Sequence, residues 1–139
     1  MRINAFKKIM WKEELPLNCP PENAAEMDLE AYRIIKDEEP EESDFLPYAL
    51  LYPENIRYRN LCEAYALSSF DSSVSAIKTF KNALKRGKLI GNFVARFEII
   101  HSDGKNIYNK RTGHISTWLY SNKTYSQFRC KEIKRINEN

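Results

Sequence analysis

The chain has 139 residues and a mass of 16.4 kDa, with a formal net charge of +3 at pH 7. This length fits one domain, and a composition of 42% hydrophobic and 29% charged residues excludes an intrinsically disordered chain. No apolar run approaches the roughly 18–20 residues that a membrane-spanning helix needs, so the sequence predicts a protein that does not cross a membrane.

The two signs of charge are unevenly distributed along the chain. Residues 1–61 carry 8 basic and 13 acidic side chains, whereas residues 62–139 carry 14 basic and 6 acidic ones. Most of the negative charge lies in Glu22–Asp44. This asymmetry favours either a solvated surface of both signs, or a basic face for nucleic acid and an acidic face for a protein partner. We therefore divide the predicted single domain, 1–139, into an acidic half and a basic half.

The first predicted element is a helix over Pro21–Ile35. Proline is tolerated in the first turn of a helix, the early acidic residues suit the helix dipole, and apolar residues from Ala24 to Ala31 recur at helical spacing. The alternative is a shorter helix followed by a strand over Tyr32–Lys36. Residues 37–53 hold three prolines among clustered acids, which predicts a loop that packs through its apolar side chains.

Two elements are predicted in the middle of the chain. Leu61–Phe70 contains apolar residues that fit a helix and an alternation that fits a strand, so its type stays open between the two. Ser73–Arg86 is predicted to be a helix, because serines that suit the N-cap precede one apolar face and Gly87 follows it as a C-terminal signal.

The C-terminal third reads as antiparallel β-structure. Alternation and turn residues predict four strands, with a hairpin at Asp103-Gly104 between the first two. Their ranges are Lys88–His101, Asn106–Lys110, His114–Tyr120 and Gln127–Ile136. The predicted fold is therefore α+β, a single domain with a C-terminal antiparallel β-meander packed against two or three helices. The predicted core contains Ile77, Phe80, Phe93 and Phe97.

The cysteines indicate a reducing compartment. Cys19, Cys62 and Cys130 are odd in number and far apart, whereas secreted disulfide frameworks normally use an even count. The N-terminal residues hold lysines at positions 7 and 8 and lack the apolar core of a secretory signal. We therefore expect three free thiols and a cytoplasmic protein.

Familiar catalytic and cofactor motifs are missing from the sequence. There is no GxGxxG, no phosphate-binding GxxxxGK[ST] loop, no HExxH, no GxSxG and no cysteine–histidine cluster with zinc spacing. The only histidines are His101 and His114, so three histidines cannot hold a metal. We predict no bound metal and no resident cofactor.

The first functional hypothesis is a small non-catalytic binding protein with a protein or nucleic-acid partner. On alternating strands, His114, Trp118 and Tyr120 share one face, and an exposed aromatic face rimmed by cations binds single-stranded nucleic acid. The competing interpretation buries Trp118 in the core and assigns the acidic segment to a protein contact. The candidate nucleic-acid-binding residues are Arg96, Lys110, Arg111, His114, Trp118 and Lys123.

The second hypothesis is an enzyme built from separate elements. Along the chain, a basic residue comes first, then a serine before a helix, and last an acid: Arg33, Ser68 or Ser69, and Glu132. This order resembles that of ADP-ribosyltransferase-like toxins, in which an early basic residue, a hydroxyl residue and a late glutamate line an NAD cleft. The resemblance implies NAD as substrate and Arg33, Ser69 and Glu132 as site residues, with His114 as a candidate general base.

A third hypothesis is a small antitoxin, immunity or inhibitor protein. The short chain, the missing motifs and the divided charge all permit this class of protein.

Overall fold

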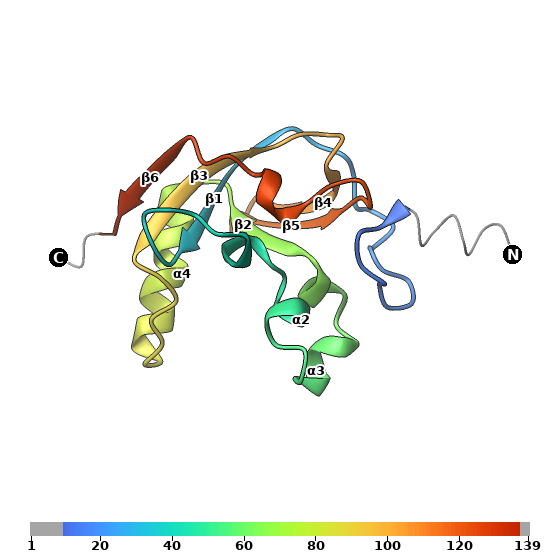
Figure 1. The fold of residues 1–139 in the computed structure, drawn as a ribbon, viewed down its shortest axis with the longest axis horizontal. Helices are drawn as coiled ribbons and strands as arrows, with labels where there is room; N and C mark the ends of the chain where they lie inside the picture. The colour runs from blue at the N-terminus through green and yellow to red at the C-terminus, as the bar shows by residue number, and fades with distance from the viewer. Residues whose placement is uncertain (1–9, 137–139) are drawn as a thin grey trace, which may run out of the picture.

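Six antiparallel strands form one sheet in the order β4-β5-β2-β1-β3-β6. This computed structural model describes residues 10–136, and Figure 1 shows the sheet with its helices. The α+β class is confirmed, with one main helix and several short helices against an antiparallel sheet. The strands are β1 (Leu29–Ile35), β2 (Leu67–Phe70), β3 (Phe93–Ile99), β4 (Gly104–Asn109), β5 (His114–Leu119) and β6 (Glu132–Arg135). The helices are α2 (Tyr48–Leu51), α3 (Ile56–Arg59) and α4 (Ser73–Lys85), with 3-10 helices η1 (Glu42–Phe45), η2 (Cys62–Tyr65) and η3 (Tyr125–Gln127).

The segment Pro21–Ile35, predicted as a helix, contains no helix, and its second half forms strand β1. This strand pairs with β3 along its whole length, from Leu29 opposite Ile99 to Ile35 opposite Phe93. The helical prediction was wrong because side chains four residues apart lie on one face in a helix and also in a strand. The alternative strand over Tyr32–Lys36 had the right type and began three residues late.

The ambiguous segment Leu61–Phe70 contains both kinds of structure. The 3-10 helix η2 covers its first part, and strand β2 follows after a single residue. β2 pairs with β5 over four residues and with β1 only where Tyr32 meets Phe70.

Helix α4 confirms the prediction for Ser73–Arg86. The Ser72 side chain accepts a hydrogen bond from the Ser75 amide, and Ala76, Phe80 and Ala83 are buried. The helix packs against β1, β2 and β3. It therefore covers the middle of the sheet, where the longest helix of residues 10–136 has the most apolar surface to bury.

The strand order differs from a consecutive meander. β3 and β4 follow each other along the chain, yet β5, β2 and β1 lie between them in the sheet. The Asp103 turn is present, with the Ile100 amide donating to its carboxylate at 2.9 Å, but the strands on either side do not pair. Gly104 instead brings β4 close to β5, since an added Cβ there would lie 2.0 Å from the Trp118 carbonyl oxygen.

The main core is an aromatic cluster on one face of the sheet. Phe97 contacts Phe45 and Phe128 at ring-centroid distances of 5.4 Å and 5.3 Å, both edge to face. Of the four core residues predicted together, Phe97 and Phe80 are buried, while Phe93 and Ile77 are half-buried. Phe93 lies at the sheet end, where its ring contacts the Arg135 guanidinium at 4.9 Å.

The prediction of three free thiols was wrong. Cys19 and Cys62 form a disulfide across 43 residues of chain, and Cys130 remains a free thiol. An odd cysteine count excludes complete pairing, but it does not exclude one bond plus one thiol. No helix within residues 10–136 is long and apolar enough to cross a membrane.

Candidate functional site

The sheet splits where β1 and β2 separate, and the Arg33 side chain occupies that split. β1 and β2 are paired only at Tyr32 and Phe70. Beyond this pair the Ser68 carbonyl has no strand partner on the β1 side, and the Arg33 guanidinium donates to it through Nη1. Arg33 Nε donates to the Asp44 carbonyl of η1. Arg33 thus joins β1, β2 and η1 at one point.

The Arg33 guanidinium donates its hydrogen bonds to carbonyl oxygens rather than to a carboxylate. No carboxylate of the residues that the structure describes lies within 4.0 Å of its guanidinium. The Asp44 carboxylate is close, but it accepts from the backbone amides of Lys36 and Glu41 at 3.2 Å and 2.7 Å. Burial lowers the pKa of Arg33, and Tyr48 and Asp44 oppose this shift. Arg33 is therefore a half-buried cation with capacity left for an anion.

A serine–histidine pair lies beside this split. Ser68 Oγ and His114 Nε2 share a hydrogen bond of 2.7 Å between β2 and β5. The Phe70 ring meets the imidazole edge on at a centroid distance of 5.4 Å. Burial and then the nearby Arg33 charge lower the pKa of His114 from 6.5, so the ring is neutral at pH 7. A neutral imidazole is able to accept a proton.

The structure distinguishes the two serines that the sequence left as alternatives. Ser68 faces His114, whereas Ser69 points to the opposite face and is fully buried. Its hydroxyl has no hydrogen-bond partner within the described part of the chain. Ser68, and not the Ser69 that was favoured, is therefore the serine that pairs with His114, and Arg33 contacts it through the backbone carbonyl.

Glu132 lies away from these residues. It is opposite Arg96 in the β3–β6 ladder, with its carboxylate 3.9 Å from the Arg96 guanidinium. Four strand spacings separate β6 from β5, the strand that carries His114. At ~4.8 Å per spacing, the distance between these two strands is about 19 Å. The structure thus brings together Arg33, Ser68 and His114 and leaves the late acid outside the group.

The residues predicted to bind nucleic acid do not form one surface. Trp118 is 1% exposed, and its indole N–H donates to the Cys62 carbonyl at 3.0 Å, so it cannot stack on a base. Arg96 pairs with Glu30 and Glu132, and Lys123 pairs with Asp103 at 3.6 Å. Lys110 and Arg111 are exposed in the β4–β5 turn. His114 is the one member of the set that reaches the Arg33 site.

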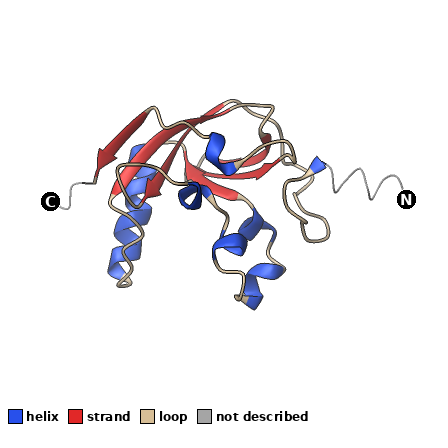
Figure 2. Cartoon of the chain, viewed as in Figure 1, coloured by secondary structure: helices blue, strands red, loops and turns tan. Residues whose placement is uncertain are grey.

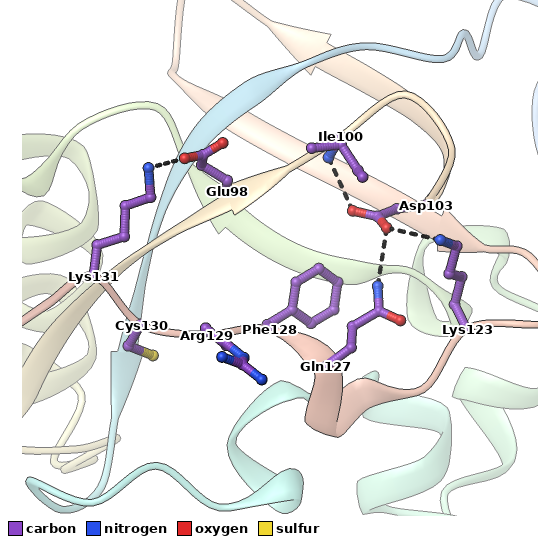
Figure 3. Close-up of a pocket in the computed structure, with 9 residues that line it drawn as sticks. All are labelled: Glu98, Ile100, Asp103, Lys123, Gln127, Phe128, Arg129, Cys130 and Lys131. Carbon is purple, nitrogen blue, oxygen red and sulfur yellow. Dashed lines mark hydrogen bonds and ion pairs between the residues drawn. The ribbon is translucent and has the colours of Figure 1, made fainter.

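A cavity of about 590 Å³ lies elsewhere, between the end of β3 and the segment that joins η3 to β6. Figure 3 shows that its charged side chains largely satisfy one another: Lys131 pairs with Glu98, while Asp103 contacts Lys123 and the Gln127 amide. Lys123 is the only predicted site residue that lines it. The cavity therefore presents few free polar groups for a ligand.

Comparisons with known proteins do not add a family. No family model, curated protein or solved structure matches this chain. Within residues 10–136 there is no group of three or more side chains suited to hold a metal ion. The geometry around Arg33 is therefore the main indication of function.

Proposed function

We propose that the protein is an ADP-ribosyltransferase-like enzyme that binds NAD beside Arg33, Ser68 and His114. The observation that carries this proposal is a half-buried guanidinium without a carboxylate partner, next to a serine–histidine pair. A guanidinium in such a place attracts phosphate, and hydroxyl and imidazole groups suit the ribose. The order of Arg33 and Ser68 along the chain, similar to that of these enzymes, adds support. The distant Glu132 departs from their pattern.

The chemistry assigned to the site is transfer of ADP-ribose. The bond between nicotinamide and ribose C1′ breaks, and nicotinamide leaves with the bonding electrons. The acceptor then bonds to C1′ and releases a proton. His114 is suited to take this proton because its lowered pKa keeps the imidazole neutral at pH 7. Arg33 would hold the pyrophosphate and fix the position of the ribose.

Two measurements test this proposal. NAD should raise the melting temperature of the wild type, since a ligand at 100 times its Kd adds roughly 2.7 kcal/mol. Nicotinamide release, followed by chromatography, should fall about 10²- to 10⁴-fold in His114→Gln, the usual contribution of a general base.

The matched control is His101→Gln. His101 is exposed within the β3–β4 turn, and its Nδ1 lies 3.1 Å from Asp28. This variant should release nicotinamide as fast as the wild type. A wild-type protein that neither gains stability from NAD nor releases nicotinamide contradicts the proposal.

The disulfide bears on where this activity takes place. Disulfides persist in oxidising compartments and are rare in the cytosol, so the Cys19–Cys62 bond supports an oxidising location. The cytoplasmic location stays a prediction that this bond does not favour. Alkylation without reductant should label one thiol in the unfolded protein, and alkylation after reduction should label three. Three labels without reductant would restore the cytoplasmic interpretation.

A further inference from the structure

An exposed group of tyrosines lies on and directly after α2 and on α3, with Tyr48 close enough to Arg33 to affect its pKa. Tyr48 and Tyr58 stack with an interplanar angle of 21° at 5.8 Å between centroids, and Tyr52 lies 6.3 Å and 6.2 Å from them. Tyr48 and Tyr52 are 49% and 47% exposed. Rings that contact one another and still leave half their surface in water offer a free aromatic face.

The two short helices α2 and α3 form a lobe that is held firmly to the rest of the protein. Leu46 and Leu50 pack on the main core, and the Tyr65 hydroxyl donates to the Arg59 carbonyl at 3.1 Å. The Asn55 side chain accepts from the Arg57 amide and caps α3. Figure 2 shows the two helices projecting from the sheet as a separate lobe. The tyrosines are therefore both fixed in position and accessible.

The lobe also carries positive charge without acidic partners. Arg57 and Arg59 flank Tyr58 on α3, and both are exposed. Neither has a carboxylate within 4.0 Å among residues 10–136. Glu54 is the only acid in residues 48–61. We define the tyrosine patch as Tyr48, Tyr52, Arg57, Tyr58 and Arg59.

We propose that the tyrosine patch binds single-stranded nucleic acid. Bases stack on exposed aromatic rings, and guanidinium groups contact the phosphates between them. Single strands fit better than duplexes, because base faces are accessible only where the bases are unpaired. A protein partner fits less well. The two arginines match the repeated phosphates of a nucleic acid, and the half-exposed rings match its flat bases. This surface is distinct from the basic set predicted around Lys110 and Trp118.

Fluorescence anisotropy with a labelled oligonucleotide tests the stacking part of the proposal. A single-stranded 20-mer is titrated with the wild type at 50 mM and 200 mM salt, without NAD, so the outcome does not depend on the enzyme proposal. Tyr52→Ala should weaken binding by roughly 5- to 150-fold, the usual effect of losing one stacked base. Tyr52→Phe keeps the ring and should bind as the wild type does.

The charge part is tested by two matched double variants. Arg57→Ala with Arg59→Ala should lower the slope of log K against log salt by about 1.4, because each lost contact to a single strand removes about 0.7. Lys110→Ala with Arg111→Ala removes the same charge from the β4–β5 turn and should leave the slope unchanged. Circular dichroism and the melting temperature establish that every variant is folded.

Three results would overturn the proposal. One is the absence of oligonucleotide binding by the wild type at 50 mM salt. Another is an equal loss of slope in the Lys110 and Arg111 double variant, which would show that the β4–β5 turn also contacts the phosphates. The third is binding to anionic lipid vesicles without binding to the oligonucleotide, which would make the patch a membrane surface.

Discussion

Two arginines on neighbouring strands have opposite surroundings. Arg96 on β3 lies on the open face of the sheet between Glu30 and Glu132, at 3.4 Å and 3.9 Å from their carboxylates. Arg33 on β1 lies in the split of the sheet, where its partners are the carbonyls of Ser68 and Asp44. The charge of Arg96 is neutralised by exposed acids, whereas the guanidinium of Arg33 is solvated by backbone carbonyls.

The difference arises from strand alternation and from where the sheet is continuous. Tyr32, opposite Arg96, points to the open face, so the next residue, Arg33, points to the buried one. An arginine on a buried face needs hydrogen-bond partners, and the unpaired carbonyl at the β1–β2 split provides one. Net charge alone therefore does not identify a binding site. The hydrogen-bond partners of each cation decide whether it is free to bind an anion.

The largest effect is expected for Phe97, which shares the buried face of the sheet with Arg33. Phe97→Ala should lower the free energy of unfolding by roughly 3–5 kcal/mol, because it empties a fully buried space against Phe45 and Phe128. Urea denaturation measures the change. A loss under about 1 kcal/mol would show that Phe97 does not belong to a packed core on this face.

The second effect concerns Arg33 itself. Arg33→Met keeps an apolar chain of similar length but removes the donors to the Ser68 and Asp44 carbonyls. The free energy of unfolding should fall by about 2–3 kcal/mol, since each unsatisfied buried acceptor costs roughly 1–3 kcal/mol and the site is half-buried. Urea denaturation again provides the measurement. An unchanged midpoint would mean that Arg33 does not hold the split together.

The sequence predicted best where a pattern was long and had one period. Helix α4 extends over 13 residues with a capping serine, and it was expected within one residue of its ends. The strand core Phe93–Ile99 followed from alternation, although the predicted range was longer at both ends. Local side-chain chemistry is sufficient for such elements because each residue supports the same structure.

The sequence predicted worst where the structure depends on distant partners. β1 was expected as a helix, because Ala31 and Ile35 share a face in either structure and only pairing with β3 decides between them. The β3–β4 turn was recognised, but its residues carry no information on which strands pair. The Cys19–Cys62 bond joins segments 43 residues apart, and no local signal indicates it.

The candidate site was predicted in part. Arg33 and His114 were named from their residue types, but the choice between Ser68 and Ser69 needed the register of β2 against β5. That register places Ser68 beside Ser116 and Phe70 beside His114, which leaves Ser68 diagonal to the imidazole. Glu132 was named as the late acid from chain order alone, and chain order does not give distance across a sheet.

The third effect is a pH dependence at the split. Burial lowers the pKa of His114 in the folded state, so the unfolded chain binds a proton at higher pH than the folded one. Stability therefore falls as pH drops below about 6.5, by at most about 1.4 kcal/mol per pH unit for one proton, until the lower folded pKa is reached.

His114→Gln should remove this component of the slope, and His101→Gln serves as the exposed control. Urea denaturation of both variants between pH 7.5 and 5, expressed as differences from the wild type, isolates the contribution. An identical pH dependence in wild type and His114→Gln would show that the ring is not held neutral beside Arg33.

The smallest effect is expected for Arg96, the arginine on the open face. Arg96→Ala should change the free energy of unfolding by less than about 1 kcal/mol, because its acidic partners are about half-exposed and surface ion pairs contribute little. The effect should shrink further at high salt, since ions screen exposed pairs. Urea denaturation of Arg96→Ala and Arg33→Met at 50 mM and 500 mM salt measures both. If Arg96→Ala costs as much as Arg33→Met at both salt concentrations, position in the sheet does not distinguish the two arginines. Arg33, in the split between β1 and β2, would then no longer stand out as the cation that binds an anion.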